Sequence, residues 1–140
     1  MTSHLFNLRV YWEDTDAGGL VYHANYLKFA ERARTEMLRH IGIEQEKLRG
    51  EAGLLFVVRR LVAEYLQPAR LDDDLAVATE VTRLGGASLE LDQEVRRGER
   101  PLVRLALRIG CLGRNGRPRR LPAAIAAAFA SLNKDNLTKE

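Results

Sequence analysis

The chain has 140 residues, of which 46% are hydrophobic and 29% are charged, and its formal net charge is +3. These values predict one globular domain spanning residues 1–140. They argue against a membrane span, because the longest apolar run, "LPAAIAAAFASL", is too short to cross a bilayer. They also argue against nucleic-acid binding, because the arginines form no concentrated basic face.

The N-terminal sequence and the cysteine count favour a cytoplasmic protein. The stretch "MTSHLFNLRVYWED" lacks the basic and apolar regions of a secretory signal. Cys111 is the single cysteine, which excludes an intrachain disulfide and a CxxC metal pair. A peripheral position at the inner membrane stays open.

The first part of the chain is predicted to form one strand and one long helix. Residues 5–12 alternate as in a half-buried strand, with four apolar side chains on one face: Phe6, Leu8, Val10 and Trp12. From Tyr26 the apolar spacing becomes three, four or seven, which predicts an amphipathic helix that ends near Gly42. Its apolar stripe comprises Leu27, Ala30, Ala33, Met37, Leu38 and Ile41. A short helical patch is expected over residues 44–53.

Four more strands are predicted over residues 54–67, 74–85, 87–98 and 101–113. Turn-forming residues such as Pro68, Gly85 and Gly86 separate them. The short connections predict that successive strands are antiparallel neighbours. A closing helix is expected over residues 121–132, with Pro122 near its first turn.

This order of elements predicts an α+β fold. A single amphipathic helix must bury its stripe, and the only large apolar surface available is one face of the sheet. We therefore expect an antiparallel sheet of about five strands that curls around one long central helix. One long edge strand is left open, and the candidate is residues 54–66, which are apolar on both faces at their start.

The connection before the helix, "EDTDAGGLVYHANY" (residues 13–26), carries more polar and flexible residues than a simple turn needs. Gly18 and Gly19 allow a ligand to approach the main chain closely. His23 lies where the helix begins, and unpaired N–H groups there can stabilise a developing oxyanion. Asp16 lies on a loop that can fold over the same end. A carboxylate and an oxyanion donor that face one gap form a minimal hydrolytic site.

Each of these residues also has a purely structural interpretation. Asp14 and Asp16 can cap the helix or form an Asx turn, and Asn25 is predicted to be a helix cap. His23 alone is more typical of a structural histidine than of a catalytic one. The combination of Asp16 with two glycines and His23 favours a functional Asp16. No metal site is expected, because no second ligand stands at a suitable spacing from His23.

The stretch "RVYWEDTDAGGLVYHANYLKFAERARTEML" (residues 9–38) closely resembles the signature of hot-dog-fold acyl-CoA thioesterases of the 4-hydroxybenzoyl-CoA thioesterase class. Within that class it is most similar to the Tol-Pal-associated YbgC group, which has the same D-T-D, Gly-Gly and Y-H-A-N-Y pattern. The later stretch "FVVRRLVAEYLQPARLDDDL" resembles the family's strand after the helix. Trp12 departs from the pattern, because the family is expected to have a second tyrosine there.

The resemblance implies a thioester hydrolase in which Asp16 acts as nucleophile or as general base on water. The backbone N–H near His23 would polarise the thioester carbonyl, with assistance from the His23 side chain. Gly18, Gly19 and Tyr22 would contact the substrate. A carboxylate is in general ionised at pH 7 and is a weak base there, which modestly favours nucleophilic attack. No cofactor is implied.

The implied partners are acyl-CoA, with acyl carrier protein as an alternative, and a second copy of the chain in a homodimer or a dimer of dimers. Phe56 and Val57 of one subunit would line the acyl pocket beside Asp16 of the other. The arginines of "RNGRPRR" are expected to form a solvated loop or, alternatively, a landing site for phosphates or an acidic carrier protein. Two other functions are weighed: a hot-dog dehydratase or isomerase, and a non-catalytic dimer that binds a carrier protein or a membrane-linked complex.

Overall fold

The computed structural model describes the backbone of residues 4–139 and the side chains as far as Leu132. One antiparallel sheet contains β1 (His4–Arg9), β2 (Leu55–Tyr65), β3 (Asp74–Leu84), β4 (Ser88–Arg97) and β5 (Arg100–Leu112). The helical elements are the 3₁₀ turn η1 (Trp12–Asp14), α1 (Asn25–His40), α2 (Gln45–Ala52) and α3 (Ala123–Lys139). The predicted α+β class is confirmed.

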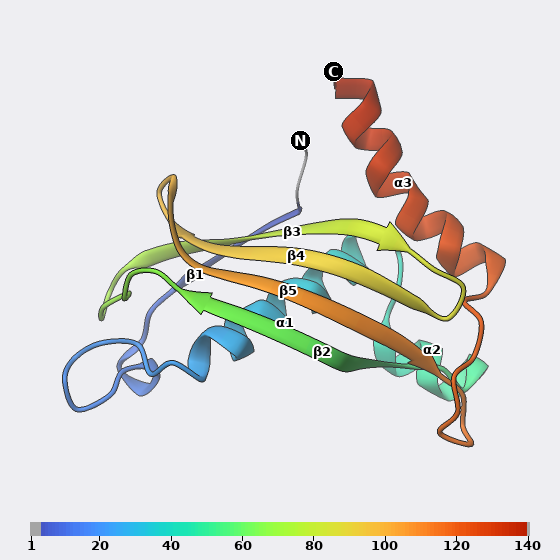
Figure 1. Cartoon of the computed structure of the whole chain (residues 1–140), viewed down its shortest axis with the longest axis horizontal. Coiled ribbons are helices and arrows are strands. Elements are labelled where there is room, and N and C mark those ends of the chain that lie inside the picture. The colour runs from blue at the N-terminus through green and yellow to red at the C-terminus, as the bar shows by residue number, and fades with distance from the viewer. Residues whose placement is uncertain (1–3, 140) are drawn as a thin grey trace.

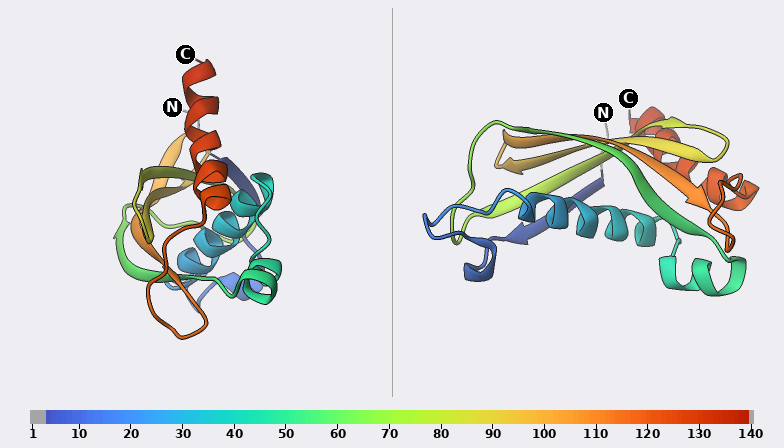
Figure 2. Two further views of the ribbon diagram at one scale, coloured as in Figure 1. Left: turned by 90° about the vertical axis from the view of Figure 1, so that its right-hand side faces the viewer. Right: turned by 60° about the horizontal axis from the view of Figure 1, so that its bottom comes forward.

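The sheet curls around α1, which lies along its concave face (Figures 1 and 2). The helical spacing of apolar residues buries six side chains of α1 against the sheet: Tyr26, Phe29, Ala30, Ala33, Met37 and Leu38. Burying a Phe or Met side chain contributes about 1.5–3 kcal/mol. Leu27 and Ile41, which were expected in the stripe, are only partly buried at its margins. Gly42 ends the helix with a φ of 86°, as predicted.

The strand order is β1-β3-β4-β5-β2, so that β1 and β2 are the edges of the sheet. β3, β4 and β5 form successive hairpins, as their short connections predict. The same expectation is wrong for β2 and β3, because β2 pairs with β5 and β3 pairs with β1. The curl of the sheet explains the difference, since residues 66–73 cross the end of the curled sheet from its β2 edge to β3 (Figure 2). The predicted edge position of β2 is confirmed.

β1 ends earlier than the alternation of residues 5–12 predicts. The Val10 N–H donates to the Asp73 carbonyl (2.9 Å), but the next N–H, that of Tyr11, donates to Asp14 Oδ2 (2.8 Å). This contact turns the backbone into η1 and leaves Trp12 82% exposed. The expected position of Trp12 on the core face of a strand is therefore wrong.

α3 begins directly after Pro122, as predicted, and its Phe129 is buried. The Phe129 ring meets the Phe56 ring of β2 edge to face, with centroids 6.0 Å apart. α3 therefore helps to close the concave face beside the start of β2. Among residues 4–139, no helix is both long and apolar enough to cross a membrane.

Candidate active site

The connection between η1 and α1 folds back on itself as a tight loop. Thr15 and Val21 form an antiparallel bridge. Inside it, the Asp16 N–H donates to the Leu20 carbonyl (2.8 Å) and the Gly19 N–H donates to the Asp16 carbonyl (3.0 Å). Gly19 has a φ of 79°, which favours glycine at this position. We call residues 15–22 the carboxylate loop.

The loop's own backbone orients the exposed Asp16 carboxylate. Oδ1 accepts hydrogen bonds from the Gly18 N–H (2.9 Å) and the Leu20 N–H (3.3 Å). A Cβ at position 18 would lie 3.3 Å from the same oxygen, so that glycine leaves room for the carboxylate. Both contacts fall on Oδ1, which leaves Oδ2 available for a reaction. Within residues 4–139, no group of three or more His, Cys, Asp or Glu side chains gathers to hold a metal ion.

Asn25 anchors the start of α1 but does not cap it. The residue before the helix is Ala24, which makes no side-chain cap. Asn25 is already helical, and its Nδ2 donates to the Asp14 carbonyl (2.8 Å), which also accepts from the Tyr22 N–H (3.0 Å). The predicted cap is wrong because Asn25 stands one position too late to reach the unpaired N–H groups of the first turn. Its side chain ties the helix to η1 instead.

His23 lies between two aromatic rings at the N-terminal end of α1. Its ring centroid is 4.5 Å from that of Tyr22 and 6.2 Å from that of Tyr65, the last residue of β2. The Tyr65 hydroxyl donates to the His23 carbonyl (3.1 Å), which joins the end of β2 to this loop. Among residues 4–139, the His23 N–H has no acceptor. It is therefore an available donor at the positive end of a helix.

The connection after β2 braces the carboxylate loop. The Val21 N–H donates to the Ala69 carbonyl (2.9 Å), and Leu20 and Arg70 form a further bridge. The Ala69 N–H in turn donates to the hydroxyl of the buried Tyr26 in α1 (2.9 Å). Burial raises the pKa of Tyr26. The carboxylate loop is thus attached on one side to the helix and on the other to residues 68–73.

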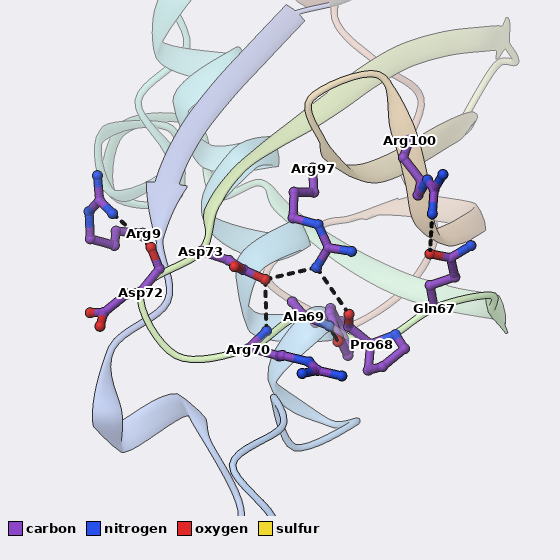
Figure 3. Close-up of polar contacts among 10 residues, drawn as sticks. Arg9, Gln67, Pro68, Ala69, Arg70, Asp72, Asp73, Arg97 and Arg100 are labelled. Carbon is purple, nitrogen blue, oxygen red and sulfur yellow. Dashed lines mark hydrogen bonds and ion pairs between the residues drawn. The ribbon is translucent and has the colours of Figure 1, made fainter.

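Arg97 holds residues 68–73 in place (Figure 3). Its Nη1 lies 2.8 Å from Asp73 Oδ2 and 3.3 Å from the Pro68 carbonyl. The Arg70 N–H donates to the same carboxylate oxygen (2.9 Å). Burial would raise the pKa of Asp73, but the Arg70 N–H and the Arg97 guanidinium together lower it below its ordinary value. The position of residues 68–73 therefore depends on an ionised Asp73.

A pocket of about 260 Å³ opens between α1 and the concave face of the sheet, and Phe56 and Val57 line it. Its helical wall is the C-terminal half of α1. Asp16, Gly18, Gly19, Tyr22 and His23 lie together at the opposite end of the same helix, which is about 24 Å long at 1.5 Å per residue. One chain therefore holds the predicted site residues in two separate places.

Two polar residues of the pocket region were missed in the sequence. Arg34 lines the pocket, and its Nη1 donates to Gln93 Oε1 (3.0 Å). The signals were present, since Arg34 follows Ala33 within the apolar side of α1 and Gln93 stands between Leu91 and Val95 on the inward face of β4. A polar side chain inside an apolar pattern has to find a partner, and these two residues find each other.

The fold and this loop define a class of protein. Residues 18–104 match the model of the thioesterase superfamily, and the chain belongs to that family. A probable thioesterase from Bartonella henselae is 42% identical and superposes with a TM-score of 0.83, covering 86% of this chain and 100% of that one. A 1,4-dihydroxy-2-naphthoyl-CoA thioesterase from Synechocystis is 20% identical, with a TM-score of 0.86 over 94% of this chain and 98% of that one. The predicted hot-dog fold is confirmed.

Within the family, the chain is similar to YbgC proteins. It is 47% identical over 133 residues to the "Acyl-CoA thioester hydrolase YbgC" of Escherichia coli O157:H7, which covers 92% of this chain and 98% of that protein. It is 45% identical over 129 residues to the "Acyl-CoA thioesterase YbgC" of Haemophilus influenzae, covering 91% of this chain and 94% of that protein. The resemblance inferred from residues 9–38 is confirmed.

Proposed function

We propose that this protein hydrolyses acyl-CoA thioesters, with Asp16 as the catalytic carboxylate and the N-terminus of α1 as the oxyanion donor. Membership of the thioesterase superfamily and the similarity to acyl-CoA thioester hydrolases over nearly the whole chain support the activity. The observation that carries the assignment of Asp16 is its geometry. Two backbone N–H groups hold Oδ1, so that Oδ2 is presented from a loop that leads directly into the helix.

The proposed reaction begins with attack of Asp16 Oδ2 on the thioester carbonyl carbon. The C–S bond breaks, CoA leaves as the thiol after taking a proton, and the acyl group remains on Asp16 as a mixed anhydride. Water then cleaves the anhydride, which releases the free acid and restores the carboxylate. The alternative is that Asp16 takes a proton from a water molecule that attacks the carbonyl. We favour the nucleophilic route because a carboxylate is a weak base at neutral pH.

The carbonyl oxygen gains negative charge in either route, and the start of α1 is placed to stabilise it. The partial positive charge at a helix N-terminus is about half a unit. Within residues 4–139 the His23 N–H has no acceptor at this end, and Tyr65 fixes the peptide of His23 through its carbonyl. A fixed donor needs no reorganisation as charge develops, which is the basis of oxyanion stabilisation. The exposed His23 side chain is a supporting donor.

The acyl pocket is proposed to be completed by a second copy of the chain. Among the described strands, β2 lies at an edge of the sheet with β5 as its one partner. It exposes four large apolar side chains: Leu55, Val58, Val62 and Tyr65. When such a strand pairs antiparallel with its own copy about a two-fold axis, the end of one strand lies beside the start of the other. Tyr65 and the neighbouring His23 of one subunit then lie beside Phe56 and Val57 of the other. Two incomplete sites thus become two complete ones in a homodimer, and larger assemblies of such dimers remain compatible.

Acyl carrier protein is the second candidate for the group that carries the acyl chain. The arginine-rich loop gives this candidate limited support, since Arg114 and Arg119 are engaged with the end of α2, donating to the carbonyls of Gly50 (3.1 Å) and Ala52 (3.1 Å). Arg117 and Arg120 remain exposed for an acidic partner. The test is the Arg117→Glu, Arg120→Glu double variant. If its kcat/KM falls for acyl thioesters of acyl carrier protein but not for acyl-CoA, the carrier protein is favoured as the substrate carrier. The expected cytoplasmic location stays a prediction.

The direct test is release of free thiol from a panel of acyl-CoA thioesters by the wild type and by Asp16→Asn. Asn keeps an oxygen that accepts from the Gly18 and Leu20 N–H groups, so that the loop geometry is preserved while the charge is lost. We expect turnover to fall by two orders of magnitude or more, because the loss of such a group costs several kcal/mol of transition-state stabilisation. Asp74→Asn is the matched control, since Asp74 is an exposed carboxylate that pairs with Arg9 at the surface. A folded Asp16→Asn protein that keeps more than about a tenth of wild-type turnover would remove Asp16 from this role.

A further inference from the structure

Arg34 lines the pocket, and a neutral side chain is its hydrogen-bond acceptor. Arg34 belongs to the third turn of α1, on the side that faces the sheet, and its side chain lines the pocket. Nη1 donates to Gln93 Oε1 (3.0 Å), a neutral acceptor. Within the described residues, no carboxylate lies within 4.0 Å of its guanidinium. A guanidinium has five N–H donors, and among the described residues Gln93 accepts from one of those of Arg34.

Gln93 fixes the direction of the Arg34 side chain. Its Nε2 donates to the Ala30 carbonyl of α1 (2.9 Å) and to Thr79 Oγ1 of β3 (2.9 Å), and both Gln93 and Thr79 are 2% exposed. This network leaves Oε1 of Gln93 as the acceptor that faces Arg34. Arg34 is only partly buried and lines the pocket, so that its remaining N–H groups are open to solvent or to a ligand bound there.

The apolar walls around Arg34 reduce its contact with water without removing it, because the residue is only partly buried. Most of the pocket is apolar, with walls that include Met37, Leu38, Phe56, Leu91, Ile109 and Phe129. Burial lowers the pKa of Arg34, and the nearby charge of Glu31 acts in the opposite direction. An arginine keeps its charge in proteins, and a partly buried charge gains from hydrogen bonds that replace the water it has lost. A ligand that brings an oxygen into this pocket would supply them.

The charges of Arg34 and Glu31 together decide which oxygen fits. Both residues line the pocket, and their formal charges sum to zero. Thr35 is engaged with Gln45, whose Nε2 donates to Thr35 Oγ1 (3.1 Å). A carboxylate would gain from Arg34 but would be repelled by Glu31, whereas an uncharged oxygen can accept from Arg34 without that penalty. A hydroxyl group can in addition donate to Glu31.

We propose that Arg34 is a specificity-determining residue that donates hydrogen bonds to an uncharged oxygen on the acyl group. The preferred substrates are then acyl thioesters that carry a hydroxyl or keto oxygen on the chain, rather than plain alkyl thioesters. This inference rests on the proposed function, because it takes the pocket between α1 and the sheet as the acyl site. The pocket volume of about 260 Å³ suits a short or medium acyl group.

The test compares matched CoA thioesters that differ only in one oxygen: butanoyl-CoA, 3-hydroxybutanoyl-CoA and 3-oxobutanoyl-CoA, with the corresponding six-carbon set. We expect the wild type to prefer at least one oxygenated member over its plain partner by about tenfold or more in kcat/KM. Arg34→Met should bring this ratio close to one, and Arg32→Met, a change of the same kind on the exposed face of α1, should leave it unaltered. A wild-type ratio near one in every set, or a ratio that survives Arg34→Met, would overturn the proposal.

A second variant keeps the test decisive if Arg34→Met does not fold. Glu31 is exposed, and Glu31→Gln removes the opposing charge without touching the Gln93 network. We expect its kcat/KM for succinyl-CoA, relative to butanoyl-CoA, to rise at least several-fold over the wild-type ratio. An unchanged ratio, or a wild type that already prefers succinyl-CoA to the uncharged oxygenated substrates, would contradict the proposal. If plain and oxygenated thioesters are hydrolysed equally well, this inference alone is overturned. If no thioester releases thiol, the proposed function is overturned.

Discussion

Arg97 Nη1 lies 2.8 Å from Asp73 Oδ2, and the ion pair joins the end of β4 to the connection between β2 and β3. That connection also holds the carboxylate loop, through the Ala69 carbonyl and the bridge between Leu20 and Arg70. A side-chain pair well away from Asp16 in sequence therefore positions the loop that carries Asp16. The relationship can be tested by changing either partner.

Replacing Arg97 by Met should reduce both stability and turnover. Hydrogen bonds to charged groups contribute about 1.5–3 kcal/mol each, and their loss leaves Asp73 partly buried without its cation. We expect the free energy of unfolding to fall by about 1–3 kcal/mol. Because residues 68–73 would then hold the carboxylate loop less firmly, we also expect kcat to fall more than KM rises. Arg97→Lys, which keeps the charge, should recover part of both quantities in urea unfolding and thiol-release measurements. If Arg97→Met has wild-type kinetics, the ion pair between Arg97 and Asp73 does not contribute to catalysis.

The same pair predicts how stability depends on pH. The folded state lowers the pKa of Asp73, so that its contribution is fully present above the ordinary carboxyl range and is lost as the pH falls through the folded pKa. The difference in thermal midpoint between the wild type and Asp73→Asn should be largest at pH 7 and should shrink below about pH 4. A difference that is constant from pH 7 to pH 3 would show that the ionised carboxylate is not what stabilises the fold.

Gly18→Ala should harm catalysis more than stability. The new Cβ would lie 3.3 Å from Asp16 Oδ1 and would push the carboxylate from its position. Displacing a reacting group by a fraction of an ångström costs on the order of 10–100-fold in rate. Gly50→Ala is the matched control, because its Cβ meets no atom within 4 Å and α2 gains from alanine by up to about 1 kcal/mol. Equal kinetic effects of the two substitutions would contradict the assignment.

His23→Ala should slow thiol release by about tenfold to a hundredfold, the effect of a supporting donor. The backbone N–H survives the substitution, so that the proposed main oxyanion donor remains in place. His40→Ala, at the other end of α1, serves as the control. If a folded His23→Ala protein is as inactive as Asp16→Asn, the imidazole is an equal partner in the reaction.

Mixing two inactive variants tests the shared site. Asp16→Asn lacks the carboxylate, and Val57→Trp blocks the pocket that Val57 lines. In a homodimer formed through β2, subunit exchange creates one intact site in each mixed dimer, so that activity should return after mixing. Sedimentation at assay concentration should show at least a dimer. A fully active monomer would end the proposal of a site shared between subunits.

The helix and strand positions could be predicted from the sequence because local periodicity determines them. The spacing of Ala30, Ala33 and Met37 places these apolar side chains on one face of α1, which has to be buried. The alternation along β4 likewise places the buried side chains on one face of that strand. The carboxylate loop could be predicted for a different reason, since glycines and an aspartate in one short segment are expensive unless they serve a turn or a site.

The remaining features depend on contacts between residues far apart in the chain. Periodicity does not show that β2 pairs with β5 instead of β3. It also misses the hydrogen bond from the Tyr11 N–H to Asp14 that ends β1, although this contact spans only three residues. The pairing of Arg34 with Gln93 joins residues on α1 and β4 that only the packed fold brings together. Periodicity can mark each of them as unusual, but it does not say which residue is the partner.

The strand order also means that β2 is synthesised well before the strand with which it pairs. β2 is complete at Tyr65, yet β5, the strand with which it pairs, begins at Arg100. At about 5–20 residues per second, a ribosome needs several seconds to make the missing segment. During that time β2 exposes Val58 and Val62 before its partner strand has been made, and an unpaired apolar strand invites association with other chains. The segment proposed to recognise a second subunit is therefore also the one most in need of protection while the chain is being made.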